Sequence, residues 1–229
     1  MLVSHRYKFI YTKTVKTAGT SVESYFEPYC MKEGEWSFAH SRDEYTSETG
    51  IIGYRGNQIP DDCVYYNHMP AQKIKNLLGE DIWNSYFKFC VVRNPFSKAA
   101  SYYYFRGRKE LLTGKKGLLK RLLYPTEKLK FLEYLKKIKP VIDRDKYLIN
   151  DKFCLDDVIY QEELNRDIER ICHKLSIPFE PKRIQFLKKE EKQKKLSLQE
   201  LYSYEAKAII KQVYAFELDY FNYSFPHNK

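Results

Sequence analysis

The sequence lacks any long run of apolar residues. Its longest uninterrupted apolar runs are four residues, such as Cys63–Tyr66 and Phe89–Val92. A helix that crosses a membrane needs about 20 such residues, so none is expected. The first residues reach a lysine, Lys8, too early for the apolar stretch of a signal peptide. We therefore expect a soluble, cytoplasmic protein.

Cysteine is scarce and scattered. The five cysteines are odd in number and include no Cys-x-x-Cys pair, which argues against a disulfide framework and against a zinc site. Internal repeats and low-complexity linkers are also missing. With 229 residues, 43% of them hydrophobic, the chain is long enough for a proper core. We predict one domain, residues 1–229, that uses no metal.

Acidic residues are fewer than basic ones, and the imbalance is local. The formal net charge is +10, and Arg106–Lys139 holds twelve Lys or Arg against three Glu. We predict a basic helical insertion at about 106–140. Such a cluster is either a solvated helical face or a surface that concentrates anions, such as nucleic acid, acidic polysaccharide, phosphorylated nucleotide or membrane.

Short strands alternate with helical patterns along the chain. The predicted strands are Tyr7–Thr12, Cys63–Asn67, Phe87–Val92 and Asp157–Tyr160. The predicted helices are Gly19–Phe26, Pro70–Leu78, Pro95–Arg106, Leu164–Leu175 and a C-terminal region with a capping box at Ser197 and Glu200 and a restart at Ser203. This alternation predicts an α/β fold with a central parallel sheet flanked by helices. Ligands of such sheets bind beyond the carboxyl ends of the strands.

The first strand runs into Lys16-Thr-Ala-Gly-Thr-Ser21 and then into a helix. Free backbone N–H groups and the positive helix end favour a phosphate in such a loop. The segment is not a Walker A loop, because Lys16 precedes its only glycine. The plain alternative is an ordinary turn with Ser and Thr as caps.

A second candidate anion site follows the Phe87–Val92 strand. Arg93 ends that strand, and Ser97 and Ser101 share one face of the next helix. An arginine beside a serine hydroxyl suits a phosphate, although Arg93 could also be a capping or surface residue. Two anion sites at two strand ends suggest a nucleotide with phosphates on both sides of its ribose.

The two motifs together, Lys-Thr-Ala-Gly-Thr-Ser and then Val-Val-Arg-Asn-Pro-Phe-Ser-Lys-Ala-Ala-Ser-Tyr-Tyr-Tyr, resemble the sulfotransferases that act on carbohydrates. The resemblance extends to heparan sulfate 2-O-sulfotransferases and is closest in character to compact bacterial or viral members. It implies a P-loop-like sulfotransferase fold and 3′-phosphoadenosine 5′-phosphosulfate (PAPS) as donor, with PAP as product. Lys98 stands where an arginine is common, and the charged Lys182–Leu198 segment matches poorly.

Residue by residue, the resemblance implies a 5′-phosphosulfate site formed by Lys16, Thr17, Ala18, Gly19, Thr20 and Ser21. It implies a 3′-phosphate site formed by Arg93 and Ser101. A cation at Lys16 would also stabilise the charge that develops on the leaving phosphate, so Lys16 is a candidate catalytic residue and no metal is required.

The acceptor hydroxyl needs a general base, and histidine is the usual choice near neutral pH. His68 directly follows the predicted strand Cys63–Asn67, which places it at the same sheet edge as both anion sites. A base histidine in a similar place in heparan sulfate 2-O-sulfotransferases favours His68. His40 is the second candidate, and a structural histidine is the plain alternative.

The leading hypothesis is therefore transfer of a sulfuryl group from PAPS to a hydroxyl, less readily an amine, of a neutral or anionic saccharide. One alternative is a nucleotide kinase with a variant phosphate loop. Another is a non-enzymatic anion- or nucleic-acid-binding protein that uses residues 106–139, although this segment contains no recognisable binding motif. The acceptor, the position sulfated and the oligomeric state are not encoded in any motif.

Overall fold

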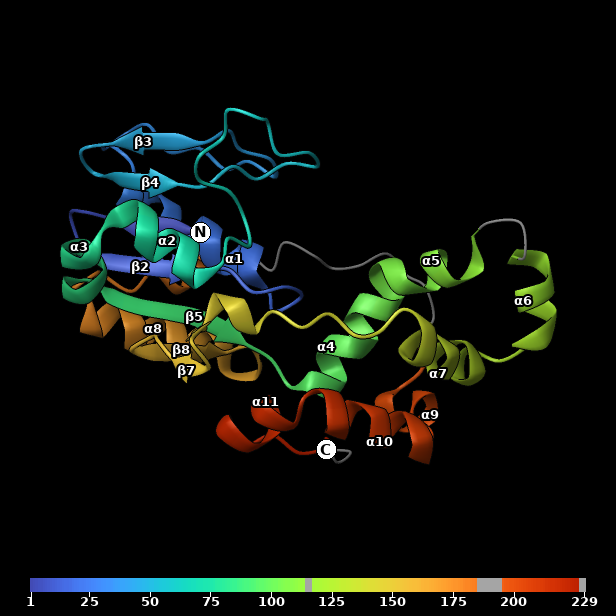
Figure 1. Cartoon of the computed structure of the whole chain (residues 1–229). Coiled ribbons are helices and arrows are strands. Elements are labelled where there is room, and N and C mark those ends of the chain that lie inside the picture. The colour runs from blue at the N-terminus through green and yellow to red at the C-terminus, as the bar shows by residue number, and fades with distance from the viewer. Residues whose placement is uncertain (114–116, 185–194, 227–229) are drawn as a thin grey trace. The chain divides into compact units, whose positions relative to one another are not determined.

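The computed structural model describes residues 1–113, 117–184 and 195–226. Packing divides the chain into two compact units, Met1–Val92 with Asp143–Lys189, and Arg93–Ile142 with Glu190–Lys229. Figure 1 shows the elements of both units. Compact packing units do not show how many domains fold independently. The single domain at residues 1–229 therefore stays a prediction.

The first unit contains a mixed sheet of six strands in the order β3-β4-β1-β2-β5-β8. Its strands are β1 Leu2–Ser4, β2 Phe9–Thr12, β3 Tyr45–Ser47, β4 Gly50–Ile52, β5 Phe87–Val92 and β8 Asp157–Tyr160. The pairs β2–β5 and β5–β8 are parallel, and the other three pairs are antiparallel. The α/β class is confirmed, and the predicted parallel sheet is correct only for β2, β5 and β8.

Helices flank this sheet. They are α1 Gly19–Phe26, α2 Ala71–Leu78, α3 Glu80–Ser85 and α8 Leu164–Lys174, with short 3₁₀ turns at Glu27–Cys30, Arg144–Lys146, Gln161–Glu163 and Pro181–Arg183. A separate two-stranded sheet joins β6 Leu148–Ile149 and β7 Lys152–Phe153. The helices predicted at 19–26, 70–78 and 164–175 are confirmed to within a residue or two.

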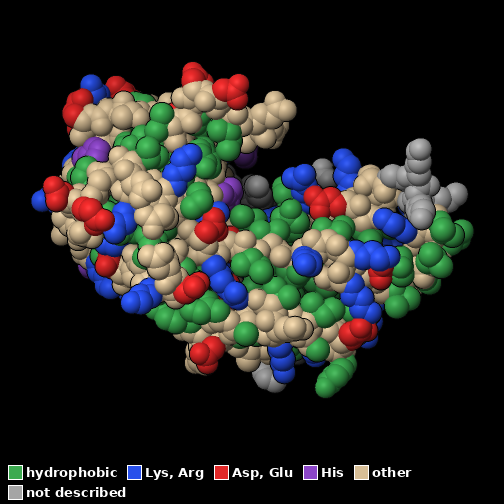
Figure 2. Space-filling view, in the orientation of Figure 1, with side chains coloured by type: hydrophobic (Ala, Val, Ile, Leu, Met, Phe, Trp, Pro, Cys, Tyr) green, Lys and Arg blue, Asp and Glu red, His purple; other side chains and the backbone are tan. Residues whose placement is uncertain are grey.

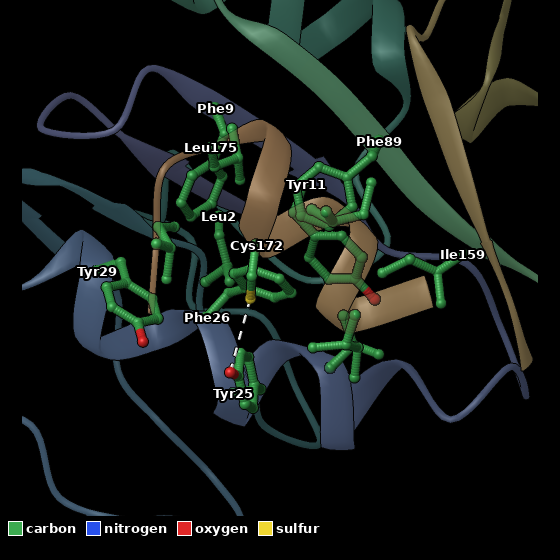
Figure 3. Close-up of a cluster of buried hydrophobic side chains, with 14 of the residues drawn as sticks. Leu2, Phe9, Tyr11, Tyr25, Phe26, Tyr29, Phe89, Ile159, Cys172 and Leu175 are labelled. Carbon is green, nitrogen blue, oxygen red and sulfur yellow. Dashed lines mark hydrogen bonds between the residues drawn. The ribbon is translucent and has the colours of Figure 1, made fainter. Parts of the chain in front are cut away.

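One face of the sheet forms the main core with α1 and α8. Phe9 and Phe89 lie on neighbouring strands with ring centres 5.8 Å apart, and Phe26 of α1 packs against both. Figure 3 shows these rings and the hydrogen bond of 3.6 Å from the Cys172 thiol of α8 to the Tyr25 hydroxyl. All five side chains are fully or almost fully shielded from water. This packing holds β2 and β5 against α1, the helix that follows the loop after β2.

The second unit is helical. Its helices are α4 Pro95–Tyr102, α5 Arg108–Leu112, α6 Gly117–Leu123, α7 Glu127–Lys137, α9 Leu198–Leu201, α10 Tyr204–Val213 and α11 Ala215–Tyr220, with a wide π-helical turn at Tyr103–Gly107 between α4 and α5. Its core is aromatic. The ring centre of Phe131 lies 5.2 Å from that of Tyr103 and 4.8 Å from that of Tyr202. The capping box of Ser197 and Glu200 is confirmed.

The strand predicted at Cys63–Asn67 is wrong. This segment forms only one isolated bridge, between Tyr54 and Tyr66. The Glu44 carboxylate accepts hydrogen bonds from the backbone N–H groups of Val64 and Tyr65, both at 2.9 Å, so a side chain replaces the neighbouring strand that those groups would need.

Two predicted segments are only partly described. Lys115 and Lys116 of the basic segment, and residues 185–194 of the charged Lys182–Leu198 segment, lie outside the described residues. Among the helices of residues 1–113, 117–184 and 195–226, none has the length and apolar character needed to cross a membrane.

Candidate functional site

The loop between β2 and α1 has an unusual backbone. Lys16 and Ala18 adopt left-handed conformations, with φ of 60° and 62°, which residues other than glycine rarely adopt. Ala18 occupies the N-cap position of α1 and supplies no capping side chain. Such a turn directs successive N–H groups into a concave anion site at a positive helix end. Strained backbone of this kind concentrates at functional sites.

Buried hydroxyl and carboxylate groups brace the loop. The Thr14 hydroxyl lies 2.8 Å from the Thr17 hydroxyl and donates to the Val91 carbonyl of β5 at 2.5 Å. The Val15 N–H donates to the Asp143 carboxylate at 2.6 Å. These contacts fix the loop against the neighbouring strand, so the fold itself sets the conformation of the loop.

Gly19, the first residue of α1, is closely packed against β2 and Lys13. A β-carbon at this position would lie 3.1 Å from the Tyr11 hydroxyl and 3.2 Å from Cγ of Lys13. Both atoms would have to move to admit a larger residue. Glycine therefore allows α1 to start directly against β2.

His68 lies at the start of the same loop. Its Nδ1 is 3.0 Å from the carbonyl oxygen of Lys13, and a carbonyl can only accept, so Nδ1 carries the proton and Nε2 has the free lone pair. Burial, followed by the nearby Lys13 ammonium, lowers the pKa of His68 to about 4. The residue is neutral at physiological pH and can accept a proton at Nε2. Its own φ of 59° is also left-handed.

A network of buried charged side chains lies next to the loop and includes Lys13. Glu23 of α1 and Glu27, the first residue of the 3₁₀ turn that follows α1, are fully buried. The Lys13 ammonium lies 2.5 Å from Glu23, and Arg55 contacts both carboxylates, while Trp36 Nε1 donates to Glu27 at 3.1 Å. Burial acts to raise the pKa of Glu23, but the neighbouring cations, Lys13 first, hold it well below its usual value. The Lys13 ammonium is therefore a structural cation. Lys16, by contrast, is only half-buried.

The second predicted anion site lies in the other unit. Arg93 is the first residue of that unit, and half-buried Ser101 lies in the last turn of α4. Lys195 is a neighbour of Arg93, since burial and then the positive charge of Arg93 lower the pKa of Lys195. The Asn94 side chain caps α4 by accepting from the Phe96 N–H at 3.0 Å. The buried Lys98 ammonium lies 5.8 Å from the ring centre of Tyr214, in the interior of the unit.

The structure thus brings His68 together with the Lys16–Ser21 loop in the first unit and Arg93 together with Lys195 in the second. The other candidate base, His40, is exposed, and its ring contacts Phe38 at 5.1 Å. Sequence reasoning missed Lys195 and the Glu23 network. The one available signal for the network was a pair of acids spaced by four in an otherwise apolar or small-residue helix.

Within residues 1–113, 117–184 and 195–226, no group of three or more His, Cys, Asp or Glu side chains is arranged to hold a metal ion. The chemistry available at the described site is that of cations, N–H groups, hydroxyls and one neutral imidazole.

The chain is similar to an uncharacterized protein of Archaeoglobus fulgidus. The two are 29% identical over 117 residues, which cover 49% of this chain and 86% of the relative. No family model matches the chain, and no solved structure matches it. The function is therefore argued from the chemistry of the site.

Proposed function

We propose that the chain is a PAPS-dependent sulfotransferase with a P-loop-like donor site, which transfers a sulfuryl group to a hydroxyl of a saccharide and releases PAP. The observation that carries this proposal is the hydrogen bond between His68 and the Lys13 carbonyl. This bond holds a neutral imidazole against the carbonyl of Lys13, which precedes Lys16 by three residues in the loop, and so supports a role for His68 as the base.

In the proposed reaction, the acceptor hydroxyl gives its proton to Nε2 of His68 while its oxygen attacks sulfur. The bond from sulfur to the bridging oxygen breaks, and the negative charge remains on the 5′-phosphate of PAP. Lys16 and the N–H groups of Thr17–Thr20 stabilise that charge, whereas the Ser21 N–H already donates to the Ala18 carbonyl at 2.9 Å. The negative donor, once bound, also acts to raise the pKa of His68 and strengthens it as a base.

The 3′-phosphate is assigned to Arg93 and Ser101, with Lys195 as a further cation. These residues belong to the second unit. Recognition of the 3′-phosphate is what separates PAPS chemistry from that of a kinase, whose nucleotide lacks it.

Calorimetry with PAP and AMP tests this assignment. The parent protein is expected to bind PAP much more tightly than AMP without added metal. Arg93→Ala should lose most of that preference, because a charge-assisted hydrogen bond contributes roughly 1.5–3 kcal/mol. Arg106→Ala is the matched control, since exposed Arg106 pairs with Glu110 in the same unit. Equal affinity of the parent for PAP and AMP would refute the donor assignment.

Incubation with labelled PAPS and a panel of polysaccharides then tests the reaction. Transfer to a saccharide that is lost in His68→Ala, with PAP binding retained, supports the proposed base. Transfer that continues unchanged in His68→Ala means that His68 is not the base.

A further inference from the structure

A basic cavity lies in the second unit. Its volume is about 270 Å³, and its lining is formed by Tyr104, Arg108, Lys109, Leu112, Thr113 and Arg121. Three cations, one aromatic ring and no acid therefore face it. The volume is just below the lower limit of about 300 Å³ for pockets that hold drug-sized ligands, so it suits one ring-sized group. Figure 2 shows Lys and Arg side chains gathered on the surface over α5 and α7.

The wide turn at Tyr103–Gly107 orients the cavity wall. A π-helical turn contains one residue more than an α-helical turn, so it rotates the following α5 by about 100° relative to an uninterrupted helix. Gly107 makes this possible, because a β-carbon there would lie 2.4 Å from the ring of Tyr134. Single π-helical turns occur frequently at functional sites.

Tyr104 is fixed in place before any ligand arrives. Its ring centre lies 5.1 Å from that of Tyr103, and the Lys195 ammonium lies 5.6 Å from the same ring centre. Its hydroxyl accepts a hydrogen bond from the Leu196 N–H at 3.2 Å. A wall that is already ordered loses little conformational freedom on binding. Lys195, whose ammonium lies over the Tyr104 ring, also feels the positive charge of Arg93, the residue assigned to the donor.

The cations of the cavity are not equivalent. Arg108 is held by Glu127, which accepts from its Nε at 3.0 Å and its Nη2 at 2.9 Å. Lys109 and Arg121 are exposed, and neither forms an ion pair with an acid in the described part of the chain. The charge available to a ligand is therefore that of Lys109 and Arg121.

We propose that this cavity binds one acidic sugar residue of the acceptor chain, with its ring against Tyr104 and its carboxylate or sulfate group toward Lys109 and Arg121. The inference deepens the proposed function, because it rests on a saccharide acceptor and specifies that the acceptor is anionic. Single-stranded nucleic acid fits less well, since it requires a charged groove with several stacking rings, whereas one concave cavity here contains one tyrosine.

Fluorescence anisotropy with a labelled heparin-derived hexasaccharide, measured without donor, tests the cavity. The double variant Lys109→Gln, Arg121→Gln is expected to bind about tenfold more weakly, or about 1.4 kcal/mol. The double variant Lys128→Gln, Lys211→Gln removes the same charge from exposed positions of the same unit and should change affinity less than about twofold.

Tyr104 has its own test. Tyr104→Leu removes the flat ring and should weaken hexasaccharide binding, while Tyr104→Phe keeps the ring and should retain it. Thermal unfolding of each variant checks that the unit remains folded.

Three outcomes overturn the inference. They are equal losses in the two double variants, competition by neutral maltohexaose as strong as that by the unlabelled hexasaccharide, and tighter binding of a thymidine oligonucleotide with the same dependence on Lys109 and Arg121. Because no donor is present, these outcomes are independent of PAP binding. If the protein fails to bind PAP but binds the hexasaccharide through this cavity, the proposed sulfotransferase activity is refuted and the acidic-sugar site is supported.

Discussion

The partly buried imidazole of His68 should make the stability of the first unit depend on pH. Its pKa is about 4 in the folded protein, against a usual value of 6.5. The unfolded chain therefore takes up a proton in this range while the folded chain does not. Stability is complete above about pH 6.5 and falls as the pH falls toward 4, because protons favour the state that binds more of them.

The two values give the size of the effect. Between about pH 8 and pH 5, the difference in proton uptake lowers the free energy of unfolding by about 2 kcal/mol. This is a large share of the roughly 5–15 kcal/mol that stabilises a typical domain. His68→Asn is the appropriate variant, because asparagine tolerates the left-handed φ of 59° and its amide can still donate to the Lys13 carbonyl.

Urea unfolding followed by tryptophan fluorescence measures the effect where it arises, since both tryptophans, Trp36 and Trp83, lie in the first unit. Between about pH 8 and pH 5, the free energy of unfolding should decrease by about 2 kcal/mol more in the parent than in the variant. His173→Asn, which removes an exposed imidazole from α8, should follow the parent. Parallel pH curves for the parent and His68→Asn would refute this account of the partly buried imidazole.

Three further changes have defined outcomes. Lys16→Ala should lower kcat for sulfuryl transfer by about 10²–10³ through loss of one electrostatic donor, and an unchanged kcat in a labelled-PAPS assay would exclude that role. Ala18→Gly should raise the free energy of unfolding by about 0.5–1 kcal/mol, because glycine relieves the left-handed strain at some cost in chain entropy; a lower Tm would contradict this. Arg55→Met should destabilise the protein by about 3–5 kcal/mol, since Glu23 and Glu27 would remain buried with less compensation, and chemical denaturation measures the loss.

Much of the fold could be predicted because strong local signals agree with the tertiary structure. The strands at Phe87–Val92 and Asp157–Tyr160 and the helix at Gly19–Phe26 have the predicted bounds. The antiparallel strands were missed because each has only three residues, as in Leu2–Ser4, too few to show an alternating pattern. The Cys63–Asn67 segment has strand-forming residues, but Glu44 satisfies its backbone from a distant part of the chain, which no local pattern reveals.

Part of the candidate site could be predicted from the sequence, although the prediction for His68 rested on a wrong strand. The loop after β2 could be read from its glycine, hydroxyl groups and position. His68 was placed at the sheet edge by a strand that does not exist, yet its side chain reaches the end of β2 through the Lys13 carbonyl. The left-handed φ values of Lys16 and Ala18 and the proximity of Lys195 to Arg93 depend on tertiary packing, so sequence spacing could not give them.

The partner of His68 is a main-chain atom, and this has a consequence for engineering and for sequence drift. No substitution at position 13 removes the carbonyl oxygen that orients the imidazole. Exchange of Lys13 keeps the acceptor of His68, but it removes a cation partner of buried Glu23 and the positive charge that helps to lower the pKa of His68. The orientation of the candidate base is therefore insensitive to the side chain at position 13, whereas its pKa and the support of the loop depend on that side chain.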